Sequence, residues 1–128
     1  MKKEVGLWID YRQAVIVTLF DQEEKIERIT SGIEKYVRDS GSGDDTREDK
    51  RDRLDRRFDN YLSKYYDEVI TYLRHADSIL IFGPGEAKSE LQKRLEEQAL
   101  GERIFGIETT DSMTDGQVAA KVRKYFQG

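Results

Sequence analysis

Residues 78–86 read Ser-Ile-Leu-Ile-Phe-Gly-Pro-Gly-Glu, and they carry the strongest fold signal in the chain. The apolar run 79–82 is typical of a strand that is buried on both faces of a parallel sheet. Glycines and a proline then form a tight turn, and Pro84 and Glu86 are favoured in the first turn of a helix. That helix is expected to end at Gly101. Its buried stripe is predicted to be Ala87, Leu91, Leu95 and Ala99.

Three strands are predicted before this stretch. Residues 5, 7 and 9 are apolar at the spacing of a strand, and residues 14–20 form a continuous run rich in β-branched side chains. The segment 25–31 is half charged, which is typical of an edge strand. Short polar turns separate the three segments, so they are expected to form an antiparallel meander.

Two more helices and a fifth strand complete the pattern. A long helix is predicted from about Asp49 to about His75, because eight apolar or aromatic residues recur at helical spacing: Leu54, Phe58, Tyr61, Leu62, Tyr65, Val69, Tyr72 and Leu73. The fifth strand is predicted over 103–108. Thr114 and Gln117 form a capping box that begins the last helix, and Met113 and Val118 form a hydrophobic staple.

The resulting order, β-β-β-α-β-α-β-α, predicts an α/β fold. With right-handed crossovers, it gives a mixed five-stranded sheet in the order 3-2-1-4-5. An antiparallel three-strand meander and three helices make this a ribonuclease H-like layout. The length of 128 residues predicts a single domain, 1–128.

Composition excludes several kinds of site. The chain has no cysteine and one histidine, His75, so disulfides, thiolate metal sites and multi-histidine metal sites are not expected. We expect no cofactor and no metal. The net charge of −4 argues against general binding of duplex DNA. No apolar run is long enough for a membrane span and no signal peptide is recognisable, so a cytoplasmic location without membrane contact is expected.

A charged segment precedes and enters the long helix. Residues 39–46 contain no apolar side chain and are rich in Gly, Ser and Asp, so a mobile loop is predicted at about 38–50. Five arginines that follow are candidates for contact with RNA phosphates: Arg47, Arg51, Arg53, Arg56 and Arg57. The alternative is a solvated helix face, with acidic and basic residues paired at i and i+4.

Two stretches resemble the middle domain of the eukaryotic and archaeal peptide-chain release factors and of Pelota. One is residues 79–91, in which a hydrophobic strand, Gly-Pro-Gly and a helix with a lysine follow one another. The other is residues 8–16, which resemble that domain's first hairpin. The Gly/Ser loop and the Arg-rich helix start resemble the release factors' loop and helix. The chain is also similar to bacterial proteins related to archaeal release factors.

The loop departs from the release-factor pattern. The family carries Gly-Gly-Gln there, whereas residues 40–45 read Ser-Gly-Ser-Gly-Asp-Asp. The only Gly-Gln pair is Gly116-Gln117, at the predicted start of the last helix. Peptidyl-tRNA hydrolysis by the release-factor route is therefore not expected.

Two further candidate sites lie at predicted strand ends. Gly83, Gly85 and Lys88 are a candidate phosphate-binding turn, because free N–H groups at a helix start bind anions; the alternative is a purely structural turn. Four carboxylates are candidates for a Mg²⁺-dependent nuclease of the ribonuclease H type: Asp10, Glu86, Glu108 and Asp111. For Asp10, the alternative is capping of a turn.

The resemblance favours a non-catalytic, translation-associated module that binds the ribosome, tRNA, other structured RNA or a ribosome partner. The contact surface would be the loop and the start of the long helix. The Mg²⁺-dependent nuclease and a protein-binding adaptor remain as alternatives.

Overall fold

The computed structural model describes the backbone of residues 2–33 and 47–128, and the side chains of residues 2–33 and 58–128. It contains strands β1 (Glu4–Ile9), β2 (Gln13–Phe20), β3 (Glu23–Thr30), β4 (Ser78–Gly83) and β5 (Ile104–Thr109). The helices are α2 (Arg47–Leu73), α3 (Ala87–Glu97) and α4 (Asp115–Gln127), with a short 3-10 turn, η1 (Gly101–Arg103). Most of the predicted loop at about 38–50 lies outside the described residues. The long helix begins at Arg47, two residues before the predicted start.

The five strands form one sheet in the order β3-β2-β1-β4-β5, as predicted. β1 pairs antiparallel with β2, and β2 pairs antiparallel with β3. β4 pairs parallel with both β1 and β5. The antiparallel meander therefore continues into a parallel half, and the fold class deduced from the sequence is confirmed.

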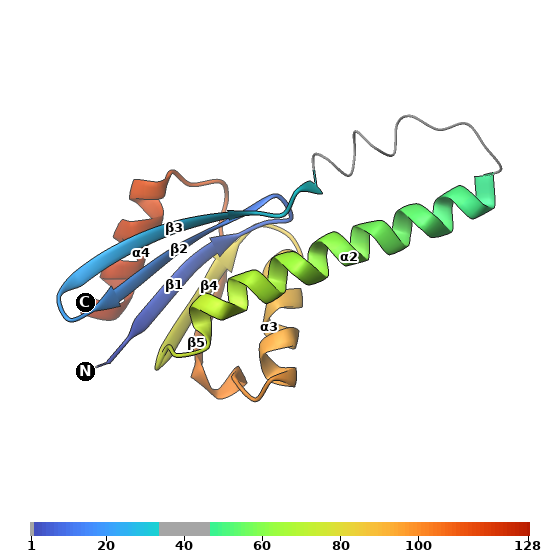
Figure 1. Ribbon diagram of the computed structural model, residues 1–128. Helices are drawn as coiled ribbons and strands as arrows, with labels where there is room; N and C mark the ends of the chain where they lie inside the picture. The colour runs from blue at the N-terminus through green and yellow to red at the C-terminus, as the bar shows by residue number, and fades with distance from the viewer. Residues whose placement is uncertain (1, 34–46) are drawn as a thin grey trace.

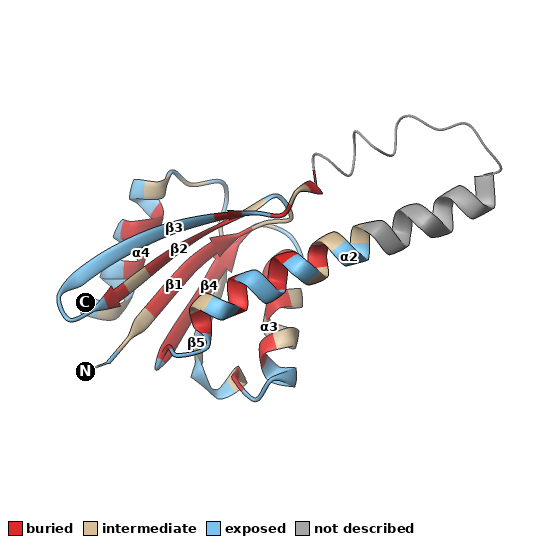
Figure 2. Cartoon of the chain, in the orientation of Figure 1, coloured by how far each residue is buried: buried red, intermediate tan, exposed pale blue. Residues whose placement is uncertain are grey.

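Helices cover both faces of the sheet (Figure 1). One face of the sheet packs against α2 and α3. Its buried side chains are the odd-numbered apolar residues of β1 and β4, together with Ala14, Ile16 and Ile29. Against α4, the other face packs Trp8, Leu80 and Phe82 with Val15, Val17 and Leu19. Figure 2 shows that β1 and β4 are buried along most of their length. The apolar run in β4 is thus explained by helices on its two faces.

The second helix differs from the prediction at both ends. It begins at Ala87, so Pro84 and Gly85 belong to the preceding turn. It ends at Glu97, because Ala99 adopts a left-handed φ of 62°. The Leu100 N–H then donates to the Leu95 carbonyl at 2.8 Å, and the Ala99 N–H donates to Glu96. This Schellman-type end leaves Ala99 exposed and buries Leu100, so the predicted role of Ala99 in the stripe is wrong.

The two sheet edges are unlike each other. β3 is exposed except at Ile29, as expected of a charged edge strand. β5 begins at Ile104, one residue later than predicted, because Gly101–Arg103 form the 3-10 turn. Its pairing with β4 shifts by one residue, so that Phe105 is an extra residue and its side chain is 62% exposed.

The start of α4 agrees with the capping-box prediction. The Thr114 hydroxyl accepts from the Gln117 N–H at 3.1 Å, and the Gln117 side chain accepts from the Thr114 N–H at 2.9 Å. Gln117 is therefore a capping residue, and the Gly116-Gln117 pair lies at the beginning of a helix.

Candidate functional site

The four candidate carboxylates have separate structural surroundings. Asp10 follows β1, and its Oδ1 accepts from the N–H groups of Arg12 and Gln13, both at 2.8 Å. These two bonds shape the turn into β2.

Glu108 on β5 accepts from Lys121 Nζ on α4 at 2.8 Å. Glu86 is the N-cap residue of α3, and its side chain makes no capping bond. Asp111 uses its backbone carbonyl to accept from the Trp8 indole at 3.0 Å.

A metal centre needs several ligand side chains that converge on one point. Among the residues whose side chains the structure describes, no group of three or more histidines or carboxylates is placed to hold a metal ion. The hydrogen bonds of the Asp10 carboxylate favour a turn-capping role, and the ion pair of the Glu108 carboxylate with Lys121 favours an ion-pairing role. The part of the chain that the structure describes contains no helix with the length and apolarity that a membrane crossing requires.

The candidate phosphate turn is built by close packing. Gly83 has φ 148°, and an added Cβ would lie 2.2 Å from the Ile9 carbonyl oxygen. Lys88 is buried, and its ammonium group donates to the Gly85 carbonyl at 2.6 Å. The lysine thus closes the turn with its own side chain, and phosphate binding at this turn stays a prediction.

The five candidate arginines lie outside the residues whose side chains are described. Arg47, Arg51, Arg53, Arg56 and Arg57 all belong to the first eleven residues of α2. Helix α2 runs past the ends of the strands, away from α3 and α4 (Figure 1). The start of the helix therefore lies away from the packed core.

A cluster that the sequence analysis missed joins three elements. Glu90 on α3 accepts from the Tyr11 hydroxyl at 2.7 Å and from the Tyr66 hydroxyl at 2.8 Å. Tyr11 lies in the β1–β2 turn, and Tyr66 lies on α2. We call these three residues the tyrosine clasp. Tyr66 is 1% exposed, although the apolar stripe predicted for the long helix does not include it.

Arg94 and Tyr65 extend the contacts around the clasp. The Arg94 guanidinium lies 5.2 Å from the centre of the Tyr66 ring and donates to the Ser63 hydroxyl at 3.2 Å. Tyr65 donates to the Asp10 carbonyl at 2.9 Å. Burial, followed by the hydrogen bond to Glu90, raises the pKa of Tyr11 from 10.0 to about 12. Burial also raises the pKa values of Tyr65 and Tyr66.

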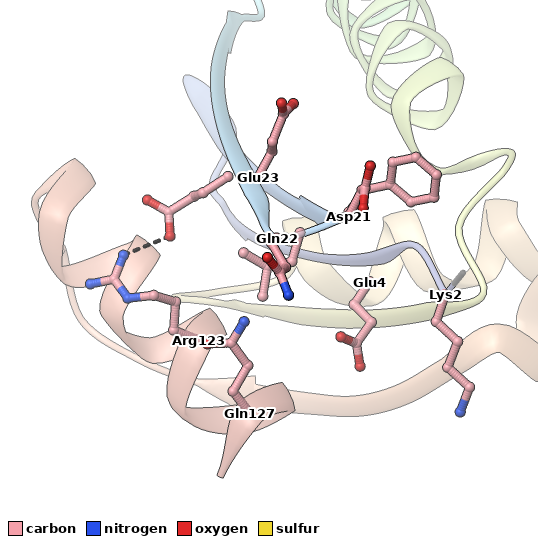
Figure 3. A pocket seen from close by; sticks show the side chains of 10 residues that line it. Lys2, Glu4, Asp21, Gln22, Glu23, Arg123 and Gln127 are labelled. Atoms are coloured by element: carbon pink, nitrogen blue, oxygen red, sulfur yellow. Dashed lines mark hydrogen bonds and ion pairs between the residues drawn. The ribbon is translucent and has the colours of Figure 1, made fainter.

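Three surface hollows accompany these features. One, of about 490 Å³, lies beside the clasp between α2 and α3 and is lined by residues that include Asn60, Ser63 and Lys93. A second, of about 290 Å³, lies between the β2–β3 hairpin and the end of α2 and includes Tyr72. Figure 3 shows a third, of about 470 Å³, in which Arg123 on α4 pairs with Glu24. None of the sequence-predicted site residues whose side chains the structure describes lines these hollows, and Glu90 of the clasp lines the first.

The fold and these contacts define a three-layer α/β domain whose long helix extends beyond the sheet. Comparison with solved structures finds proteins that share this fold, among them the three that follow. Pelota from Thermoplasma acidophilum matches 99% of this chain with a TM-score of 0.59 and 16% sequence identity. Pelota from Archaeoglobus fulgidus matches 95% with a TM-score of 0.58 and 14% identity. The archaeal translation termination factor aRF1 matches 98% with a TM-score of 0.59 and 14% identity.

The matches cover only part of those proteins. This chain spans 32%, 31% and 35% of the three chains, which is about one third of each. No protein-family model matches the sequence, and no curated protein matches it. At this level of identity, the comparison shows that the chain has the fold found in a part of Pelota and of the archaeal termination factor. The resemblance noted in the sequence is thus confirmed at the level of the fold.

Proposed function

We propose that this chain is a non-catalytic, translation-associated module. The observation that supports the proposal best is the fold, which matches Pelota and a translation termination factor over 95–99% of the chain. A fold can serve several functions, so the site must carry the rest of the argument. The partner would be the ribosome, tRNA or a protein bound to the ribosome.

The contact surface would be the segment 38–57, which includes the start of α2. It contains the five candidate arginines, whose planar guanidinium groups suit phosphate oxygens. Helix α2 extends beyond the sheet, so its first turns can reach a surface that the domain body does not touch. Because the net charge is −4, we expect weak binding that falls steeply with salt, with a log–log slope of roughly −0.7 to −0.9 per phosphate contact.

Co-sedimentation with ribosomes at several salt concentrations tests this proposal. The Arg53→Glu, Arg57→Glu double variant should lose binding at every salt concentration. Lys25→Glu, Lys124→Glu is the matched control, since both lysines are exposed and lie on β3 and α4. Each reversal changes the charge by −2, so both double variants go from −4 to −8. Equal losses in the two variants would indicate a general charge effect and contradict the assigned surface.

Two other candidate functions predict different outcomes in variants of this chain. Ribosome binding that survives in the folded Arg53→Glu, Arg57→Glu protein would favour a protein-binding adaptor. The exposed pair Phe105 and Tyr125 is the observation that supports this second candidate: their side chains are 62% and 41% exposed, and the Tyr125 hydroxyl donates to the Phe105 carbonyl. A Mg²⁺-dependent nuclease would instead require Asp10, and it is tested below.

A further inference from the structure

The tyrosine clasp lies close to where α2 leaves the domain body. Tyr66 is the α2 member of the clasp, and Phe58 lies two turns earlier on the same helix. The rings of Tyr11 and Phe58 meet edge to face, with centroids 6.1 Å apart. Tyr11 therefore contacts α2 at Phe58 and reaches Glu90 on α3 with its hydroxyl. One side chain from the β1–β2 turn thus bridges the two helices.

Two stretches in the second half of α2 are held in different ways. At the C-terminal end, Val69, Ile70 and Leu73 are fully buried against the sheet. Between residues 58 and 66, hydroxyl groups add directed contacts, from Tyr65 to Asp10 and from Tyr66 to Glu90. Apolar burial is non-directional, whereas hydrogen bonds need a narrow range of distances and angles. The polar contacts therefore suit the task of fixing the direction of the helix.

Glu90 is the residue at which the hydrogen bonds of Tyr11 and Tyr66 converge. Each of its two carboxylate oxygens accepts from a different tyrosine, so this one carboxylate fixes the positions of both tyrosine hydroxyls. Hydrogen bonds to an ionised acceptor are shorter and stronger than neutral ones. Arg94, one turn further along α3, adds its guanidinium over the Tyr66 ring and its bond to Ser63. The α3 helix thus holds α2 through neighbouring charged side chains.

We propose that Glu90 is a positioning residue that sets the direction of the first turns of α2. The part of this inference that concerns partner binding rests on the proposed function, whereas the part that concerns helix direction does not. The expected displacement of the first turns follows from the length of α2 before Phe58. Residue 50 lies about 12 Å along the helix from Phe58, at 1.5 Å per residue, so a tilt of about 20° at Phe58 displaces it by about 4 Å.

Distance measurement between two spin labels tests the helix direction. The chain contains no cysteine, so Lys25→Cys on β3 and Lys50→Cys on α2 give a labelled pair without background. With Glu90 in place, we expect one narrow distance distribution. In the Glu90→Leu background, the distribution should shift or broaden by about 4 Å. The Glu90→Ala variant should give the same result, which guards against a failure of the leucine variant to fold.

Two matched variants separate positioning from general stability. Glu90→Gln keeps the side-chain length and can still accept from one tyrosine and donate to the other, so it should restore the narrow distribution. Glu97→Leu removes the same charge from an exposed position of the same helix and should leave the distribution unchanged. An unchanged distribution in folded Glu90→Leu and Glu90→Ala proteins would overturn the inference.

Measurement of ribosome binding connects the direction of α2, set by Glu90, to the proposed function. If the chain binds ribosomes, Glu90→Leu should weaken binding by about fivefold or more while all five arginines remain in place. A change of distance without any ribosome binding by the unaltered chain would contradict the proposed function and leave the positioning role intact. Full binding with an altered distance would overturn the link between Glu90 and the contact surface.

Discussion

The backbone of Gly83 passes so close to Ile9 that a Cβ on the glycine would lie 2.2 Å from the Ile9 carbonyl oxygen. Gly83 is the last residue of β4 and Ile9 is the last residue of β1, so this contact joins the ends of two neighbouring interior strands. Gly83 also has φ 148°, a conformation that other residues rarely adopt. The glycine at the end of the apolar strand is therefore required by packing.

The first prediction compares the two glycines of this turn. Gly83→Ala should reduce the free energy of unfolding by about 2–4 kcal/mol, because both backbone strain and a backbone clash oppose the methyl group. Gly85→Ala is the control. Its φ is 64°, but nothing lies within 4 Å of the added atom, so a loss of about 1 kcal/mol is expected. Urea denaturation of both variants measures the difference, and equal losses would contradict the packing role of Gly83.

The second prediction concerns the contact between β1 and α4. A Cβ on Gly6 would lie 2.4 Å from a methyl carbon of Val122. Gly6→Ala should therefore cost about 1–3 kcal/mol through overpacking, and Val122→Ala about 2 kcal/mol through a cavity. The double variant should be more stable than the sum of the two losses predicts, because the smaller Val122 side chain makes room for the methyl group. Additive losses in urea denaturation would show that the two residues do not share this contact.

The third prediction concerns stability at high pH. The pKa of Tyr11 is about 12 in the folded chain, whereas its ordinary value is 10.0. As the pH rises, the Tyr11 hydroxyl therefore loses its proton at a lower pH in the unfolded chain than in the folded chain. The stabilisation from protonated Tyr11 is therefore complete below pH 10 and is lost as the pH rises toward 12. Tyr66 acts in the same direction, since burial and the bond to Glu90 raise its pKa.

Chemical denaturation between pH 9 and pH 12 measures this effect. The free energy of unfolding should fall less steeply with pH in Tyr11→Phe and Tyr66→Phe than in the unaltered chain. Tyr125→Phe is the control, because Tyr125 is exposed on α4. Identical slopes in the clasp variants and the unaltered chain would contradict the assigned pKa of Tyr11.

The fourth prediction concerns nuclease chemistry. We expect no cleavage of RNA, DNA or RNA–DNA hybrids in the presence of Mg²⁺ or Mn²⁺. Asp10→Asn is a suitable probe, because an asparagine oxygen can still accept from the N–H groups of Arg12 and Gln13 and keep the turn. Turnover that disappears in the folded Asp10→Asn protein would replace the binding module with the metal-dependent nuclease.

The fold could be predicted from the sequence because each element carries a local signal. The apolar run of β4, the charge pattern of β3 and the Thr114–Gln117 capping box all describe interactions within a few residues. Together with the right-handed crossover rule, they were sufficient for the strand order. The end of α3 was missed because Ala99, a residue that favours helices, adopts the left-handed conformation.

The tyrosine clasp could not be predicted in the same way. Tyr11 and Glu90 are 79 residues apart, and nothing in the local pattern of either one specifies the other. Tyr66 follows Tyr65 directly, and a single apolar stripe cannot contain both residues. Both are buried because α2 packs against the sheet through Tyr65 and against α3 through Tyr66, which is a tertiary arrangement.

The most direct measurement of the central claim, the fifth prediction, is site-specific photo-crosslinking to ribosomes. A benzophenone on Lys50→Cys places the probe in the first turns of α2, and the same probe on Lys25→Cys places it on β3. The absence of native cysteine makes each label unique. We predict crosslinks to ribosomal RNA or tRNA from position 50 that disappear at high salt, and none from position 25. RNA crosslinks of equal yield from both positions, or none from position 50, would contradict the account.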